Sequence, residues 1–185
     1  MQLTKIIFST LLILMMVACS TAPLNYKIDP EIKNINQFVD PSSMIALSVI
    51  DNRALTTNQQ SSLISGPENE ADVIKSKLIE ILKQNNFKII SNLLLADIAL
   101  ELHIEQFDVN IESDLFKSKI KVESQLSLQA KKNGASFNKL FKMNRSQELA
   151  NPVNSNEVTG IVNQLLSKQL STIWSDPGFI KLSNS

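Results

Sequence analysis

His103 is the single histidine of the 185 residues, and Glu101 and Glu105 flank it at a spacing of two. Residues two apart share one face of a strand, so a carboxylate there could shift the titration of the imidazole or share a metal ion with it. A strong metal site needs further nitrogen or sulfur ligands, and the chain has one cysteine. We therefore expect no metal site. We interpret these side chains as a polar sheet face that meets the lysines of the next strand, Lys117, Lys119 and Lys121.

Catalytic motifs are not evident in the sequence. Serine is frequent, but no Gly-x-Ser-x-Gly segment is present, and a catalytic triad would have to be built on His103. Four scattered glycines cannot form a glycine-rich phosphate-binding loop. We predict that the protein is not an enzyme and uses no cofactor.

Asp51 and Arg53 follow an apolar segment and lead into a polar stretch that extends to residue 67. An arginine at the end of a strand can bind a carboxylate or phosphate through its planar guanidinium group, so both residues are candidates for binding. The favoured alternative is structural. In that case Arg53 holds loop carbonyls and pairs with Asp51 or another acid.

Cys19 ends an N-terminal segment with the features of a secretory signal. Lys5 is its one charge, residues 6–17 are apolar apart from Ser9 and Thr10, and a small residue precedes the cysteine. The apolar run is shorter than the roughly 20 residues that span a bilayer. Residues 16–19 resemble the lipobox of bacterial lipoproteins, whose cysteine receives a diacylglycerol before cleavage. We predict that residues 1–18 are a lipoprotein signal peptide; the alternative is a secreted protein with a reactive thiol.

Lipidation of Cys19 would fix the location of the protein. Several acyl chains, palmitate among them, hold a protein to a membrane almost permanently. Ser20 occupies the position at which an aspartate would retain a lipoprotein in the inner membrane. We therefore expect the periplasmic leaflet of the outer membrane, with the membrane bound through the acyl chains on Cys19.

Composition restricts the partners and the size of the fold. The 18 basic and 18 acidic residues balance, which argues against nucleic acid as a partner. The chain without its signal is long enough for one domain and a tether. With one cysteine, stability has to come from an apolar core.

Hydrophobic patterns predict the elements that position these residues. Apolar or alternating segments predict strands at residues 44–51, 87–90, 98–111, 119–130 and 137–149. The alternation changes phase after Gln106, which predicts a β-bulge, and Asn133-Gly134 predicts a two-residue hairpin turn. Helical spacing predicts one helix from Glu68 to residues 84–86, and another from Asn154 that Pro177-Gly178 closes.

These elements predict one α+β domain, a two-layer sandwich with a mainly antiparallel sheet and two helices packed on one face. We assign residues 44–180 to this domain and residues 181–185 to a tail. Three prolines make residues 19–43 a lipidated tether, whose later part we expect to lie along the domain.

The phase change directs Phe107, Val109 and Ile111 toward the open sheet face or the end of the sheet, next to Leu115 and Phe116. Contiguous exposed apolar residues commonly mark a partner or lipid site. The alternative is that the tether folds back and covers them through apolar residues of its own, Ile28, Ile32, Ile35 and Phe38.

Together these segments resemble the YajG family of bacterial lipoproteins, whose members are functionally uncharacterised. The likeness rests on Cys19 with its lipobox, residues 28–32, residues 49–53, the Asn133-Gly134 turn and residues 154–181. It spans nearly the whole mature chain. The resemblance implies the fold and an envelope location, and it implies no activity.

The function we predict is a non-enzymatic binding or adaptor module of the bacterial envelope, with another envelope protein as its partner. The alternative is a carrier or sensor of a small amphipathic ligand, such as a lipid or a cell-wall fragment. An apolar cavity of about 300 Å³ or more between helices and sheet would favour the alternative.

Overall fold

The computed structural model describes residues 23–32, 43–53 and 64–185, so Cys19 lies outside the described residues. Its elements, in chain order, are β1 (Leu24–Asn25), β2 (Met44–Asp51), β3 (Ile64–Ser65), α2 (Glu70–Gln84), β4 (Lys88–Ile90), the short 3-10 helix η3 (Leu93–Leu95), β5 (Ile98–Ser113), β6 (Lys117–Lys132), β7 (Ala135–Ala150), α3 (Ser155–Trp174) and α4 (Pro177–Ser183).

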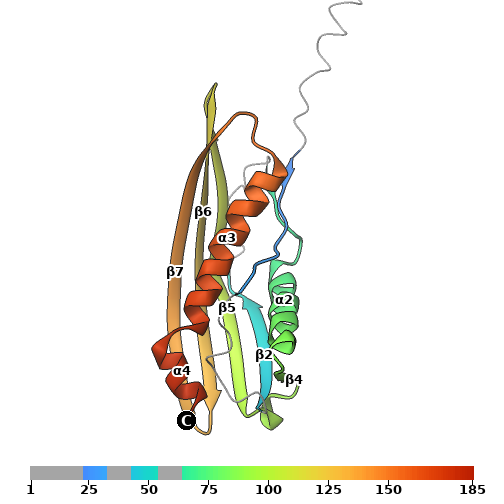
Figure 1. The fold of residues 1–185 in the computed structure, drawn as a ribbon, viewed down its shortest axis with the longest axis vertical. Coiled ribbons are helices and arrows are strands. Elements are labelled where there is room, and N and C mark those ends of the chain that lie inside the picture. Colours follow the sequence, from blue (N-terminus) through green and yellow to red (C-terminus); the bar gives the residue numbers. More distant parts are fainter. Residues whose placement is uncertain (1–22, 33–42, 54–63) are drawn as a thin grey trace, which may run out of the picture.

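The main sheet has the strand order β4-β2-β5-β6-β7. β2 runs parallel to β4 and β5, and the other neighbours are antiparallel. The three α-helices of the described residues lie on one face of this sheet, α2 over β2 and β4, and α3 and α4 over β6 and β7 (Figure 1). The predicted α+β two-layer sandwich is confirmed, with one helix more than expected.

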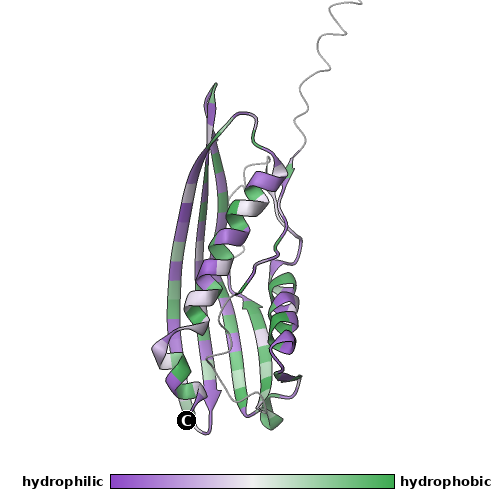
Figure 2. Ribbon diagram, viewed as in Figure 1, coloured by the Kyte–Doolittle hydropathy of each residue, from purple (hydrophilic) through white to green (hydrophobic). Residues whose placement is uncertain are grey.

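Alternation along the strands builds the core, as the hydropathy colours show (Figure 2). In β5 every second residue from Ile98 to Ile104 is buried against the helices. The pairing with β6 shifts between Ile104 and Gln106, and Phe107 is then the next buried residue. The predicted β-bulge is therefore confirmed, because the extra residue turns the following apolar side chains back toward the core.

The β6–β7 turn and the start of α3 are as predicted. Asn133 and Gly134 have φ angles of 50° and 81°, which the two-residue hairpin turn requires. Asn154 and Glu157 form the complete capping box of α3. Within α3, the buried Gln169 donates its amide to the carbonyl of Phe141 at 2.9 Å, which links the helix to β7.

The C-terminal residues form a helix that the sequence analysis missed. Pro177 opens α4 instead of only ending α3, and the Asp176 carboxylate caps it by accepting from the backbone N of Gly178 at 2.9 Å. Leu182 and Ser183 are buried, so residues 181–185 are not merely a tail. An Asp-Pro pair is a normal helix start, and that signal was present in the sequence.

The sheet gives the molecule a long axis. β5, β6 and β7 have 16 residues each, which corresponds to about 50 Å of extended strand. The β5–β6 turn lies at one end of this axis and the β6–β7 turn at the other (Figure 1). Among the described helices, none has the length and apolar character needed to cross a membrane.

Candidate functional site

Residues 23–32, which we call the strap, run in extended conformation between α2 and α3 (Figure 1). Tyr26, Ile28 and Pro30 are buried, and the residues between them are exposed. Leu24 and Asn25 pair with the short strand β3. It is thus the early part of the tether that is seen to lie on the domain; residues 33–42, the later part, are outside the described residues.

A ladder of hydrogen bonds fastens the strap to α3. Four strap amides donate to four α3 side chains, Asn25 to Ser155 (3.1 Å), Lys27 to Thr159 (3.2 Å), Asp29 to Asn163 (2.7 Å) and Glu31 to Ser167 (2.9 Å). The Asn163 side-chain amide also donates to the carbonyl of Lys27 at 3.0 Å. Each α3 side chain in the ladder therefore accepts a hydrogen bond from one strap amide.

Two matching periods make this ladder possible. Its acceptors recur every four residues of α3, a rise of about 6 Å. Its donors recur every second residue of the extended strap, a rise of about 6.5 Å. The small polar residues at a spacing of four were visible in the sequence, but the pattern has no meaning until the strap is known to lie beside the helix.

A latch of four side chains, Tyr26, Asp51, Arg53 and Glu70, closes the strap against β2 and α2. The Tyr26 hydroxyl donates to Glu70 Oε1, and Arg53 Nη1 lies 2.6 Å from Glu70 Oε2. Arg53 also binds Asp51, with Nε 2.9 Å from Oδ1 and Nη2 2.6 Å from Oδ2. The Glu70 side chain is only 5% exposed, so these two partners replace the water that its carboxylate oxygens lose on burial.

Burial and neighbouring charges set the protonation of the latch. Burial, followed by the nearby carboxylate of Glu70, raises the pKa of Tyr26, which keeps the phenol protonated as a donor. The hydrogen bond from Arg53 lowers the pKa of Asp51. The hydrogen bond to Asp51 raises the pKa of Arg53, and the guanidinium stays charged.

Gly66 is required beside the latch. A Cβ at this position would lie 2.5 Å from Cζ of Tyr26 and 2.6 Å from Oε1 of Glu70. Only a residue without a side chain permits this close approach. The backbone at Gly66 therefore packs directly against the side chains of Tyr26 and Glu70.

Asp51 and Arg53, predicted as candidates for binding, meet in this latch. Arg53 directs its guanidinium at two protein carboxylates, which is the structural alternative. Glu70 and Tyr26 were missed as site residues. An acid in the first turn of a helix and a tyrosine in a proline-rich tether are each unremarkable in a sequence.

Phe107, Val109 and Ile111, the predicted apolar candidates, lie on the helix side of β5. Phe107 is buried, with its ring 6.3 Å from that of Tyr26, and Val109 and Ile111 are partly buried against the core. The strap thus covers Phe107 through Tyr26. Of the tether residues named in the alternative, Ile35 and Phe38 lie outside the described residues. No finding tests whether these residues bind a partner.

The polar sheet face around His103 differs in detail from our expectation. Its Nδ1 lies 3.1 Å from the Asn52 amide, and its Nε2 lies 3.8 Å from Glu101. The prediction that Glu101 and Glu105 meet the lysines of β6 is wrong, because the register pairs Glu101 with Gln129. Within the described residues, no group of three or more acids, histidines or cysteines is placed to hold a metal ion.

A groove of about 400 Å³ lies between α2 and the sheet edge formed by β2 and β4. Apolar and polar residues line it together, among them Ile79, Ile89, Lys75, Lys83 and Ser48. It is open to solvent and half polar, unlike the enclosed apolar cavity that would favour a ligand carrier.

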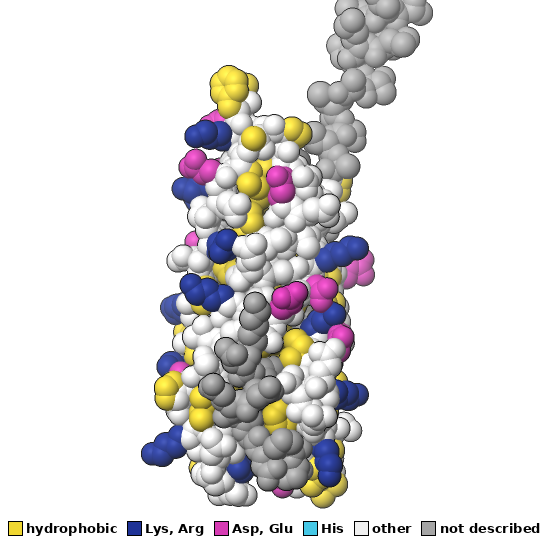
Figure 3. Space-filling view, in the orientation of Figure 1, with side chains coloured by type: hydrophobic (Ala, Val, Ile, Leu, Met, Phe, Trp, Pro, Cys, Tyr) yellow, Lys and Arg dark blue, Asp and Glu magenta, His cyan; other side chains and the backbone are white. Residues whose placement is uncertain are grey.

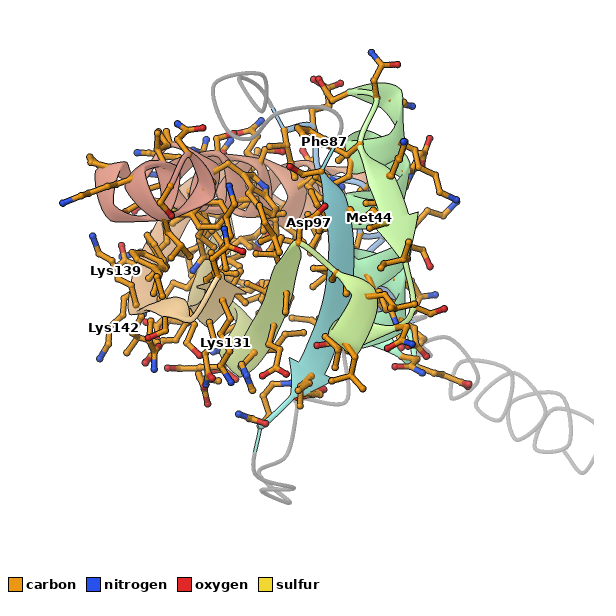
Figure 4. The ribbon with its side chains drawn as sticks, turned by 90° about the horizontal axis from the view of Figure 1, so that it is seen from below. Met44, Phe87, Asp97, Lys131, Lys139 and Lys142 are labelled. Carbon is orange, nitrogen blue, oxygen red and sulfur yellow. The ribbon has the colours of Figure 1, made fainter. Side chains whose placement is uncertain are left out.

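Exposed apolar side chains adjoin the groove, and we call Met44, Leu93, Leu94 and Leu95 the distal patch. Their exposed fractions are 36, 49, 93 and 64%. The backbone N of Asp97 donates to the carbonyl of Met44 at 2.9 Å, which links the chain after η3 to the start of β2. The view from this end of the molecule shows Met44 and Asp97 side by side (Figure 4).

Comparison with known proteins gives a family match and a shared fold. Residues 30–182 match the profile of a family described as "Uncharacterized lipoprotein". No curated protein matches the chain.

Among solved structures, an uncharacterised protein covers 83% of this chain and 97% of its own at a TM-score of 0.52 and 10% identity. This likeness supports the fold alone. Two weaker likenesses are to rare lipoprotein B from Shewanella oneidensis (TM-score 0.37, 12% identity, 70% of this chain and 87% of the other) and to lipoprotein GNA1162 from Neisseria meningitidis (TM-score 0.36, 11% identity, 71% and 99%).

Proposed function

This chain belongs to the family of uncharacterised lipoproteins, and from that premise we propose that it is a non-enzymatic adaptor of the bacterial envelope. Acyl chains on Cys19 hold it to the periplasmic leaflet of the outer membrane, and the distal patch binds another envelope protein. Within this family, the resemblance of the motifs quoted above supports membership of the YajG group as part of the proposal.

The distal patch is the observation that carries this proposal. Leu94 is 93% exposed, and two further leucines adjoin it. Burying a leucine in an interface contributes about 1.5–3 kcal/mol relative to leaving it in water. Contiguous exposed apolar side chains of this kind commonly mark a site of protein–protein interaction.

The docked strap supports an adaptor held in a defined orientation. The strap begins four residues after Cys19, at the end of the long axis opposite η3 (Figure 1). Ladder and latch hold it to the domain over residues 25–31. The distal patch is then directed away from the membrane, at the far end of strands about 50 Å long.

A ligand carrier is the second candidate, and it rests on the residues that line the groove. Lys75 and Lys83 beside Ile79 and Ile89 would suit an anionic amphipath. The groove ranks below the distal patch because it is open and half polar.

Crosslinking in intact cells tests the adaptor. A photoreactive residue at Leu94 should give one discrete adduct, and Leu93→Ser with Leu95→Ser should abolish it because the apolar contact is lost. The matched control is the same probe at Lys142, an exposed residue of β7. Identical adducts from Leu94 and Lys142, with abundant proteins only, would count against the adaptor.

A separate variant tests the anchor. Cys19→Ala should move the protein from the membrane to the soluble fraction, because no acyl chain can then be attached. A variant that still sediments with the outer membrane would contradict lipid anchoring.

A further inference from the structure

The turn between β5 and β6 ends in two large apolar side chains. Leu115 is 89% exposed and Phe116 is 79% exposed. In the space-filling view, hydrophobic side chains stand at this extreme end of the long axis (Figure 3). Exposed apolar residues at the tip of a projecting hairpin commonly mark a contact with a partner or a lipid surface.

Three residues of this turn, Asp114, Phe116 and Lys117, bond their backbone groups within the protein. Asp114 Oδ1 accepts from the amides of Phe116 at 2.8 Å and Lys117 at 2.7 Å, and the Asp114 amide donates to the carbonyl of Lys117 at 2.8 Å. Asn151 binds the turn from the β7–α3 connection, its backbone N donating to the carbonyl of Phe116 at 3.1 Å and its Nδ2 to that of Asp114 at 2.6 Å.

This arrangement suits a medium poor in water. A peptide group that enters the lipid boundary without a protein partner carries a large desolvation cost, so segments that enter it bond internally. The same bonds hold the turn rigid, with both apolar side chains directed outward.

The turn lies at the end of the molecule where the anchor attaches. β1 and the β5–β6 turn occupy the same end of the long axis (Figure 1). Cys19 precedes Pro23, the first described residue, by four positions. Even fully extended, four residues reach only about 14 Å. The membrane surface that holds Cys19 therefore lies close to this end of the domain.

We infer that Leu115 and Phe116 insert into the headgroup and acyl-chain boundary of the membrane to which Cys19 is anchored. This inference rests on the lipid anchor of the proposed function. Charge plays little part in the contact, because acids lie among the basic residues below the tip. Lys117 lies 3.7 Å from Glu148, Lys121 pairs with Glu112, and Lys119 stands opposite both acids in the strand register. Two membrane contacts, one acyl and one at the hairpin, fix the orientation of the domain.

Fluorescence quenching tests the insertion in the lipidated full-length protein. The one native tryptophan, Trp174, is buried in α3, and a Phe116→Trp variant adds an exposed indole at the tip. Leu94→Trp is the matched control, since Leu94 is at least as exposed as Phe116 and lies at the opposite end. The proteins are reconstituted into vesicles of phosphatidylethanolamine and phosphatidylglycerol, with plain or brominated acyl chains.

We expect the indole of Phe116→Trp to shift its emission to shorter wavelength in vesicles and to lose most of its intensity with brominated chains. Leu94→Trp should show neither change. The quenching should not depend on the phosphatidylglycerol fraction, because the contact is apolar.

Flotation of the same samples separates the two proposals. Protein that floats with the vesicles while Phe116→Trp remains unquenched would overturn the insertion and leave the anchor standing. Contact of the tip with a second copy or another protein would give that result. Protein that does not float would overturn the anchor, and the insertion with it.

Discussion

Replacing Tyr26 by Phe should destabilise the domain by about 2 kcal/mol. The change removes one hydroxyl and keeps the ring that contacts Phe107. Glu70 Oε1 then loses its donor at a site where the side chain is only 5% exposed, while Oε2 keeps Arg53. A hydrogen bond to a charged group contributes about 1.5–3 kcal/mol, and the retained arginine places the loss within that range and not above it.

Denaturant unfolding of the mature protein measures this loss. Ser127→Ala is the control, because its hydroxyl also donates to a carboxylate, Glu105 Oε1 at 2.9 Å, but to one that water reaches. Ser127→Ala should lower the free energy of unfolding by less than about 1 kcal/mol. Hydrogen exchange should also show faster opening of the strap in Tyr26→Phe. A loss of less than about 0.5 kcal/mol, the range of ordinary surface changes, would refute the latch.

Three further predictions concern the latch, the ladder and Gly66. Acidification should destabilise the wild type more than Asp51→Asn. The lowered pKa of Asp51 contributes stability that is present above the unfolded-state pKa of about 3.9, and this stability is lost as the pH falls through the folded-state pKa. Because the Asp51 side chain is 36% exposed, the wild type should lose less than about 1 kcal/mol more unfolding free energy than Asp51→Asn between pH 7 and pH 2. The same pH dependence of unfolding in both proteins would contradict the prediction. Asn163→Ala should speed amide exchange at Asp29 about tenfold, since a bond worth about 1.4 kcal/mol is lost; Gln164→Ala, on the exposed side of α3, should leave it unchanged. Gly66→Ala should lower the melting temperature at least as much as Tyr26→Phe, because the added methyl displaces the tyrosine; an unchanged temperature would exclude the tight packing at Gly66.

Local signals in the sequence were sufficient for most elements. The phase change at Gln106, the Asn133-Gly134 turn and the capping box of Asn154 each depend on neighbours within a few residues, and the structure has all three. α4 was missed although its Asp-Pro start is equally local, because Pro177 was interpreted only as the end of the preceding helix.

Pairing between distant segments was not accessible from the sequence. The lysines of β6 were expected beside Glu101, but strand register assigned them to the far end of the hairpin, where Lys121 pairs with Glu112. A shift of register changes every cross-strand pair at once, and composition alone does not decide it.

The sequence by itself determined the lipobox-like segment that ends at Cys19, the balanced charge, the two-layer fold class and the lack of recognisable catalytic motifs. Only the tertiary structure decided that the tether becomes a strap, that Asp51 and Arg53 belong to a latch with Glu70 and Tyr26, and which apolar residues remain exposed. The physical reason is that helix and strand patterns arise from neighbours along the chain. Burial and ion pairing depend on which distant segments meet: the strap brings Tyr26 onto Glu70, and the end of β2 brings Arg53 to the same carboxylate of α2.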